Sequence, residues 1–506
     1  MTYKFIPTPD IPKYRQLFPN LLHTRLARLY AAVLNRFGTV IGQTLYWRLP
    51  QHYTSLANNF DTQRAVRITN RLLQTGYLSS AQLVEGKFSD EPPSFMSVVQ
   101  FPHNKKASGW QGSYVHLFDP SRTYWPALGE AIERLCLLHP HYTPRETIQS
   151  SYKNLQKPKV DIFDLAGFTT QERQKSSSQN NNSYDADSRF MWLPCTELTH
   201  QTTIYAPLQW FSFSHVMAVL TDRSSTAARE AMLTAPITTG AAAGQTQDDA
   251  ILTGLFEVIE RDAFMIYWLN QIPAKRINLQ TIKNEELQQL MTIAADYRLE
   301  VHALYLQTDV PVHTIGLVLL DRTGVGPAVM VTAKTGWHID AILISLLHES
   351  LGRRSKARTT YTEVKKENKT LHPDKLGHTD RMLYWYNPKQ IEKIEPFISG
   401  ELVAHTNLPS YKATGSAKDD LQQLITWFHT HDYQILYREL ISPKLKNLTE
   451  DMSVVMVKVP KLQPLYLEEW LRSTHGARLR DIPEQLGYPR PKDKDDPFHR
   501  EPHPFP

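Results

Sequence analysis

The spacing of hydrophobic residues predicts alternating helices and strands over the second half of the chain. Apolar residues recur every three or four positions, as on one face of a helix, at about 223–233, 247–268, 283–297, 339–356 and 418–431. Short runs rich in β-branched and aromatic residues, which are typical of strands, lie at 202–215, 300–306, 313–320, 327–333, 434–440 and 453–459. This alternation predicts a mixed α/β fold.

The N-terminal part of the chain has a weaker helical pattern. Residues 22–48 predict an amphipathic helix, and residues 62–74 repeat the pattern less strongly before Gly76. We therefore expect residues 1–100 to form a mainly helical appendage. A stronger helix is predicted at 125–139, and Pro140 would end it.

Two segments have no periodic pattern. A low-complexity run of serine, glutamine and asparagine at 176–182 predicts a mobile insertion over about 171–189. The charged tail at 491–506 has neither periodicity nor a packing face, so we expect an extended, proline-rich end.

Composition limits the classes of protein to consider. Hydrophobic residues make up 41% of the 506 residues and charged residues 21%, which is typical of a globular protein. The net charge of +5 is spread along the chain, so we expect no nucleic-acid partner. Two cysteines cannot build a disulfide framework, which favours a reducing compartment. No apolar run approaches the roughly 18 residues of a membrane span, so we expect a cytoplasmic protein without a membrane segment.

The common nucleotide and zinc signatures are missing. The sequence has no GxxxxGK[ST] loop, and the Gly-Val-Gly-Pro run at 324–327 lacks a third glycine. His348 and Glu349 are not followed by a second histidine one helical turn later, as a zinc-protease helix would require. These absences disfavour a P-loop enzyme, a Rossmann enzyme and a zinc protease.

An acidic pentad occurs twice, each time within an apolar helix. Residues 130–134 and 257–261 both read Glu-x-Ile-Glu-Arg. Glutamates three positions apart share one helical face, with Cβ atoms about 5–6 Å apart. An uncompensated buried charge is costly, so such a pair near a core shares protons, pairs with cations or binds a metal. Four carboxylates from two helices suit Mg²⁺ bridging to phosphate.

Each of these signals alone has an ordinary structural explanation. A single acidic pentad is more often a solvated face with an intrahelical ion pair, and only the repeat favours a site. The small-residue segment at 238–246 leads into the second helix, where backbone N–H groups could approach an anion, but it could equally be a packing turn. A third helix carries Glu349, Arg353 and Arg354, which suit either a surface ion pair or the neutralisation of phosphate.

Together these residues resemble the YcaO family. The segment TTGAAAGQTQDDAILTGLFEVIERDAFMIYWL is similar to the central motif of that family, PALGEAIERLC to its first ATP-binding helix and AILISLLHESLGRR to its third. The resemblance covers about residues 108–506, and it implies a YcaO-type catalytic domain over 101–490. It also implies that ATP and Mg²⁺ bind through helix carboxylates, and that a backbone amide oxygen of the substrate is phosphorylated.

The resemblance also implies the roles of individual residues. Four glutamates would hold Mg²⁺: Glu130, Glu133, Glu257 and Glu260. Five further residues would bind the nucleotide: Gln245, Asp249, Arg261, Glu349 and Arg353. The chain departs from the family pattern at three positions that bear on ATP affinity, namely Pro126 at a usual serine, Gln111 near a usual lysine and Gly352 at a usual glutamine.

The last five residues match the Pro-x-Pro-x-Pro ending of the azoline-forming branch of that family. Polyproline geometry presets an extended peptide at little entropic cost. The terminal carboxylate of Pro506 could therefore thread into the site and act as a positioned base, with a disordered end as the alternative.

The implied reaction is an ATP-dependent cyclodehydration of Cys, Ser or Thr in a ribosomal precursor peptide, giving thiazoline or oxazoline. The implied partners are that peptide, a leader-binding protein similar to ubiquitin-activating proteins, and a flavin-dependent azoline dehydrogenase. A homodimer within a hetero-oligomer is also implied. Two alternatives stay open: a non-catalytic scaffold that binds the precursor, and a YcaO enzyme that makes a thioamide or an amidine.

Overall fold

The structure is a computed structural model of the chain. It describes residues 60–102, 111–169, 172, 184–221, 230–365, 371–490 and 497–505. The helix expected at 22–48 and the low-complexity run at 176–182 lie outside the described residues, as does most of the helix expected at 223–233. Residues 230–233, the described end of that last segment, are not helical.

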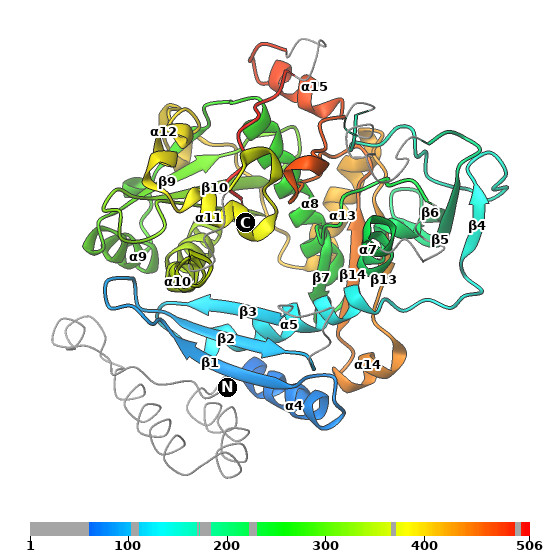
Figure 1. The fold of residues 1–506 in the computed structure, drawn as a ribbon, viewed down its shortest axis with the longest axis horizontal. Coiled ribbons are helices and arrows are strands. Elements are labelled where there is room, and N and C mark those ends of the chain that lie inside the picture. Colours follow the sequence, from blue (N-terminus) through cyan, green and yellow to red (C-terminus); the bar gives the residue numbers. More distant parts are fainter. Residues whose placement is uncertain are drawn as a thin grey trace.

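The described residues form three sheets, which confirms the mixed α/β class (Figure 1). The first is antiparallel and consists of β1 (Ser80–Glu85), β2 (Phe95–Gln100) and β3 (Gln111–His116). The second has the order β11 (Val329–Gly336), β10 (His313–Asp321), β9 (Leu299–Tyr305), β8 (Lys275–Asn278) and β12 (Leu402–Ala404), with β12 parallel to β8. The third has the order β4 (Ile148–Ser151), β5 (Arg189–Glu197), β13 (Leu436–Glu439), β14 (Ser453–Lys458) and β7 (Ala241–Gly244), and β6 (Thr202–Pro207) also pairs with β5.

Three helices connect these sheets and carry the residues of interest: α5 (Ser121–Leu138), α8 (Gln247–Leu269) and α10 (Ile339–Lys365). The other helices of the described chain are α4 (Phe60–Gln74), α7 (Phe213–Thr221), α9 (Glu285–Asp296), α11 (His378–Trp385), α12 (Ile391–Ile394), α13 (Ala417–Thr430), α14 (Pro443–Leu448) and α15 (Arg478–Gln485). In Figure 1, α10 lies above the three-stranded sheet and α8 runs through the middle of the molecule.

Helix α8 is the centre of the core. Its residues are buried on nearly all sides from Ala250 to Leu269, because it packs against β7 and β14 on one side and against β10 and β11 on the other. Despite its 23 residues, no helix of the described chain is long and apolar enough to cross a membrane.

Most of the predicted elements form where the hydrophobic pattern places them. Two of these predictions differ from the structure: the strand expected at 202–215 ends at Pro207 and gives way to helix α7, and the described end of the helix expected at 223–233 is not helical. The side chain of Ser212 accepts a hydrogen bond from the backbone N–H of His215 (3.2 Å), and this local bond favours a helix start over further strand.

The described part of the first 100 residues is not a helical appendage. Helix α4 confirms the weak pattern at 62–74, but β1 and β2 follow it and pair with β3, so the boundary expected at residue 100 passes through one sheet. Glu91, between β1 and β2, forms a buried ion pair with Arg354 of α10 (2.6 Å). Short strands that gain their burial from distant elements have too weak a local pattern to be recognised.

The described part of the tail, residues 497–505, packs against the core, which corrects the expectation that it has no packing face. Phe498 and Phe505 are both 4% exposed, and His503 is fully buried. The indole N–H of Trp385 donates a hydrogen bond to the carbonyl of Pro502 (3.1 Å). Isolated aromatic anchors between prolines follow no period, so a periodicity analysis misses them.

The closest packing between a strand and a helix occurs at Gly112 of β3. A Cβ atom there would lie 2.0 Å from the carbonyl oxygen of Ala127 and 2.3 Å from the backbone nitrogen of Ala131, both in α5. Gly129 of the same helix is a matched control, because its nearest neighbour would be the Cβ atom of Ala243 at 3.9 Å.

We expect Gly112→Ala to lower the free energy of unfolding by about 1–3 kcal/mol, because backbone atoms of a helix cannot move aside cheaply. Gly129→Ala should leave stability unchanged or raise it by up to about 1 kcal/mol, since alanine favours a helix. Denaturant unfolding of both variants checks this. Equal stability of the two would contradict the close packing of β3 on α5.

Candidate active site

The acidic and basic residues singled out in the sequence lie on α5, α8 and α10. Each of these helices pairs a glutamate with the arginine four residues later, at N···O distances of 2.5, 3.1 and 3.0 Å, in Glu130–Arg134, Glu257–Arg261 and Glu349–Arg353. The intrahelical ion pair that was the ordinary explanation is therefore present. These pairs are not on a solvated face, however, because the side chains of Glu130 and Glu257 are only 24% and 27% exposed.

Backbone N–H groups orient one glutamate of each pentad. The N–H of Ser113 in β3 donates to Glu130 Oε2 (2.6 Å). The N–H of Gly240 donates to Glu257 Oε2 (3.1 Å). Gly240 has a φ of +90°, and a Cβ atom there would lie 2.1 Å from the carbonyl oxygen of Val457, so only glycine fits this turn.

The two pentads face each other. Burial raises the pKa of Glu133 well above its ordinary value, and the negative charges of Glu257 and Glu130 raise it further, against a smaller opposing effect of Arg134. Glu133 lies on α5 and Glu257 on α8, so the carboxylates of the two helices share one electrostatic environment.

The third helix joins the same cluster. Burial raises the pKa of Glu260 to about 8. The negative charges of Glu257 and Glu349 raise this pKa further, while the positive charge of Arg261 lowers it. Arg261 Nη1 lies 3.2 Å from Glu260 Oε1. The pKa of Arg353 is raised by Glu349 first, and Glu130 of α5 also contributes.

Two lysines of this cluster were not predicted as site residues from the sequence. Lys458 ends β14, donates from Nζ to the carbonyl of Thr239 (2.8 Å) and faces Glu257; burial lowers its pKa to about 8. Lys356 of α10 also has a pKa lowered by burial and by the charge of Arg353. Two sequence signals could have identified these lysines. Lys458 ends the otherwise apolar strand SVVMVK, and Lys356 lies one helical turn after Arg353.

Gln245 and Asp249 lie at the start of α8. The segment predicted as a loop at 238–246 contains strand β7, which pairs with β14 and leads directly into the helix. Asp249 accepts hydrogen bonds from the backbone N–H (3.1 Å) and the hydroxyl (2.7 Å) of Thr246, so it has a capping role in this structure. Gln245 is exposed and accepts a hydrogen bond from Arg64 of α4 (3.0 Å).

The structure shows where Arg354 and the three departures from the family pattern, Gly352, Pro126 and Gln111, lie. A Cβ atom on Gly352 would lie 2.3 Å from Val115 Cγ2, so β3 fills the space that a longer side chain needs. Pro126 lies in the second turn of α5, which begins four residues earlier than predicted. Gln111 is the first residue of β3 and bonds to Gln100 (3.4 Å). Arg354 is buried between Glu91 and Asp321 (both 2.6 Å), so its charge is already paired outside this cluster.

The tail reaches the same cluster. The guanidinium of Arg261 lies over the ring of Phe505, 4.0 Å from its centroid. Arg261 Nε is buried without a hydrogen-bond partner among the described residues. Pro506, the predicted base, lies outside the described residues, so its role stays a prediction.

The cluster fits the cofactors implied by the sequence. Burial raises the pKa values of Glu133 and Glu260, and the negative charges of neighbouring carboxylates raise them further. A hard divalent cation such as Mg²⁺ would supply compensating positive charge through oxygen ligands. A buried guanidinium nitrogen without a partner suits a phosphate oxygen. The residues present therefore fit magnesium and a phosphate-bearing ligand together.

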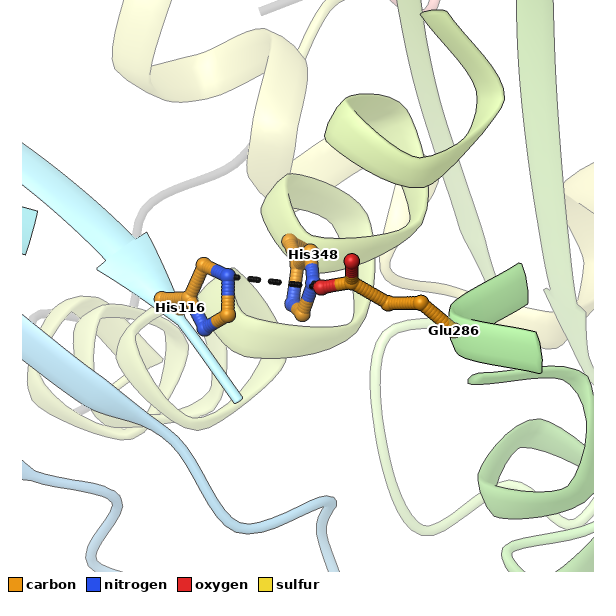
Figure 2. Close-up of side chains that lie close together, drawn as sticks. All are labelled: His116, Glu286 and His348. Atoms are coloured by element: carbon orange, nitrogen blue, oxygen red, sulfur yellow. Dashed lines mark hydrogen bonds and ion pairs between the residues drawn. The ribbon is translucent and has the colours of Figure 1, made fainter. Parts of the chain in front are cut away.

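A second cluster of titratable groups lies where β3, α9 and α10 meet (Figure 2). Nε2 atoms of His116 and His348 lie 3.7 and 3.0 Å from the same oxygen, Oε1 of Glu286, and the two rings stack with centroids 3.6 Å apart. Figure 2 shows both rings beside this one carboxylate. The three ligand-type atoms lie within 4.8 Å of one another, which raises the question of a metal site.

The hydrogen bonds of the two rings argue against that metal site. The backbone N–H of Asp119 donates to His116 Nδ1 (3.0 Å), and the backbone N–H of Leu117 donates to His348 Nδ1 (3.2 Å). Since both Nδ1 atoms accept, each neutral ring carries its proton on Nε2; that of His348 donates to Glu286 (3.0 Å), whereas Nε2 of His116 lies 3.7 Å from the same oxygen, beyond hydrogen-bond distance. Burial lowers the pKa of His116 to about 3 and lowers that of His348, so both rings are neutral. The cluster therefore ties β3 to α9 and α10.

The raised pKa of Glu260 has a measurable consequence for stability. Between pH 4.5 and about 8 the folded protein keeps a proton on Glu260 that the unfolded chain has released, so without metal its stability falls as the pH rises through this range. We expect the Tm of Glu260→Gln to fall less between pH 5 and pH 8 than the Tm of the wild type does, with a difference between the two falls of about 1–3 °C. Calorimetry in EDTA measures both.

The matched control is Glu363→Gln, which changes an exposed carboxylate on the same α10 that carries Glu349. This variant should follow the wild type at every pH. Mg²⁺ with a nucleotide should raise the Tm of the wild type at pH 8 more than that of Glu260→Gln. Identical pH profiles for Glu260→Gln and the wild type would contradict the burial of an ionisable Glu260.

Comparisons with known proteins agree with this geometry. Residues 119–463 match the family described as YcaO cyclodehydratase, which binds ATP and Mg²⁺. An uncharacterized protein of Methanothermobacter thermautotrophicus is 29% identical over 126 residues, which are 24% of this chain and 33% of that protein.

Three solved structures share the fold. A heterocyclase in complex with substrate and cofactor has a TM-score of 0.66 at 17% identity, over 87% of this chain and 57% of that one. The heterocyclase TruD has a TM-score of 0.56 at 18% identity, over 75% of this chain and 50% of that one. YcaO from Methanopyrus kandleri bound with AMPPCP and Mg²⁺ has a TM-score of 0.55 at 14% identity, over 83% of this chain and 95% of that one. This chain thus spans about half the length of the two heterocyclases.

These findings confirm the resemblance inferred from the sequence. The cofactors expected from it, ATP and Mg²⁺, are those of the matching family. Because the match covers more than half of the sequence and the structure gathers the repeated acidic pentads at one cluster, the chain belongs to the YcaO family.

Proposed function

We propose that the protein is an ATP-dependent cyclodehydratase that forms thiazoline or oxazoline rings from Cys, Ser or Thr in a ribosomal precursor peptide. The observation that carries this proposal is the meeting of the two acidic pentads, where burial and the charge of Glu257 on α8 raise the pKa of Glu133 on α5. A cluster so rich in carboxylates suits magnesium-bound phosphate better than it suits a bare organic anion.

The proposed roles follow from position and charge. The four pentad glutamates, Glu130, Glu133, Glu257 and Glu260, would hold Mg²⁺. Glu260 is buried and the other three are partly buried, and burial together with neighbouring carboxylates raises the pKa values of Glu133 and Glu260. Arg261 and Arg353 would contact ATP, because both guanidinium groups border the carboxylates and can bind phosphate oxygens. Glu349 would keep Arg353 in place through its 3.0 Å ion pair. Asp249 and Gln245 would define the edge of the nucleotide site at the start of α8.

ATP would supply a good leaving group to a reaction that otherwise has to expel water. The side chain of Cys, Ser or Thr adds to the preceding amide carbonyl, the oxygen of that carbonyl accepts the γ-phosphoryl group, and phosphate then leaves with the oxygen. The protein would have to hold the peptide close to the cluster and remove the proton of the attacking side chain.

We propose the carboxylate of Pro506 as the group that removes this proton. Phe505 supports this, because it is buried and stacks on Arg261, which is itself paired with Glu257. A carboxylate one residue further along would be within reach of the same cluster.

We also propose four partners: the precursor peptide, a leader-binding protein similar to ubiquitin-activating proteins, a flavin-dependent azoline dehydrogenase, and a second copy of this chain within a hetero-oligomer.

The decisive experiment combines the protein with ATP, Mg²⁺, the leader-binding partner and a Cys/Ser/Thr-rich precursor encoded beside its gene. We expect phosphate release that depends on the precursor, and a product lighter by one water for each ring, measured by mass spectrometry. No phosphate release would favour the scaffold alternative. Phosphate release with a product that keeps all of its Cys, Ser and Thr side chains would favour thioamide or amidine formation.

Glu257→Gln tests the role of the pentads in that assay. The substitution keeps the shape and an oxygen that can accept from the N–H of Gly240, but it removes the charge. We expect phosphate release to fall by about 100-fold, as for the loss of one electrostatic contact to a reacting group. Glu363→Gln should have wild-type turnover, and unchanged turnover of Glu257→Gln would remove this residue from the site.

A further inference from the structure

Arg64 of helix α4 contacts Gln245, just before the start of α8. Its Nη1 donates to Oε1 of Gln245 (3.0 Å), and its Nη2 donates to the carbonyl oxygen of Glu450 (2.7 Å). Its Nε also lies 3.3 Å from the carboxylate of Glu450, and the guanidinium lies over the ring of Trp125, 5.3 Å from its centroid. The side chain is 14% exposed.

These contacts join three parts of the active-site region. Trp125 is in α5, one turn before Glu130. Glu450 follows α14 and precedes β14, the strand that ends in Lys458. Gln245 precedes the N-cap of α8. Arg64 itself lies outside residues 119–463, which match the YcaO family.

We propose that Arg64 is a positioning residue of the nucleotide site, which orients the amide of Gln245 so that its NH₂ group is presented to an acceptor atom of the nucleotide. An arginine can only donate hydrogen bonds, and an amide side chain can accept only through its oxygen. The contact with Arg64 therefore holds Oε1 of Gln245 on the side of α4 and leaves the NH₂ group to point elsewhere. This inference rests on the proposed function, because it takes Gln245 as part of the ATP site.

The neighbouring arginines provide a matched control. Arg67 and Arg71 contact the same carboxylate of Glu450, at 3.4 and 3.1 Å, and their side chains are 47% and 44% exposed. Neither donates to Gln245. Replacing Arg67 thus removes one ion pair to Glu450 and leaves the hydrogen bond from Arg64 to Gln245 intact.

The experiment measures the binding of AMPPCP with Mg²⁺ to the full chain by calorimetry. We expect Arg64→Met and Gln245→Ala each to weaken binding by about 5–10-fold, the size expected for one lost hydrogen bond involving a charged or phosphate group. Arg67→Met should bind within about twofold of the wild type. The double variant of Arg64→Met and Gln245→Ala should bind no more weakly than either single variant, because both act through one amide.

Two further variants keep the test decisive if Arg64→Met folds poorly. Arg64→Lys keeps a donor and should recover part of the affinity. Gln245→Glu can still pair with Arg64 but has no N–H donor, so we expect binding as weak as in Gln245→Ala without a fall in Tm. Wild-type affinity of Gln245→Glu would overturn the proposed orientation of the amide.

The outcomes separate this inference from the proposed function. If the wild type binds AMPPCP with Mg²⁺ but Arg64→Met behaves like Arg67→Met, or if the effects of Arg64→Met and Gln245→Ala multiply, the inference is wrong and the nucleotide site stands. If the wild type does not bind AMPPCP with Mg²⁺, both fail. In the turnover assay, Arg64→Met should raise KM for ATP and leave kcat within about twofold, which a general loss of stability would not do.

Discussion

The burial of like charges where α5, α8 and α10 meet is the constraint on which this structure depends. An ionised carboxylate away from water costs several kcal/mol unless it is paired, and burial raises the pKa values of Glu133 and Glu260. The fold supplies part of the compensation itself, through an arginine four residues after one glutamate on each helix and through the backbone N–H groups of Ser113 and Gly240. Under the proposed function, a divalent cation would supply the remainder.

Close backbone contacts decide how near these charges come to one another. Gly112 lets β3 lie directly against α5, and this contact puts the N–H of Ser113 within 2.6 Å of Glu130. Gly240 makes the turn that brings its N–H to Glu257. Gly254 allows α8 to approach the carbonyl of Gly240, since a Cβ atom there would lie 2.6 Å from that oxygen. Small residues in the frame therefore set the geometry of the charged cluster.

Both ends of the described chain approach this cluster from outside the three helices. Arg64 of α4 bonds to Gln245 at the start of α8, and Phe505 of the tail stacks on Arg261 near the middle of the same helix. The neutral rings of His116 and His348 meanwhile stack on each other, and the backbone N–H of Leu117, next to β3, donates to His348 of α10. Helix α8 is thus contacted at its start and near its middle by segments that share no local sequence pattern with it.

The sequence by itself determined most of the secondary structure after about residue 240, the repeated pentads and the family, because periodicity and residue spacing are local properties. Helices α8, α9, α10 and α13 form where the apolar period places them. Only the tertiary structure decided that β1 and β2 complete a sheet with β3, that the described part of the tail is buried, that Arg64 bonds to Gln245 and that Lys458 faces Glu257. Each of these depends on a contact between residues far apart in the chain, and such a contact leaves no period in the sequence of either partner.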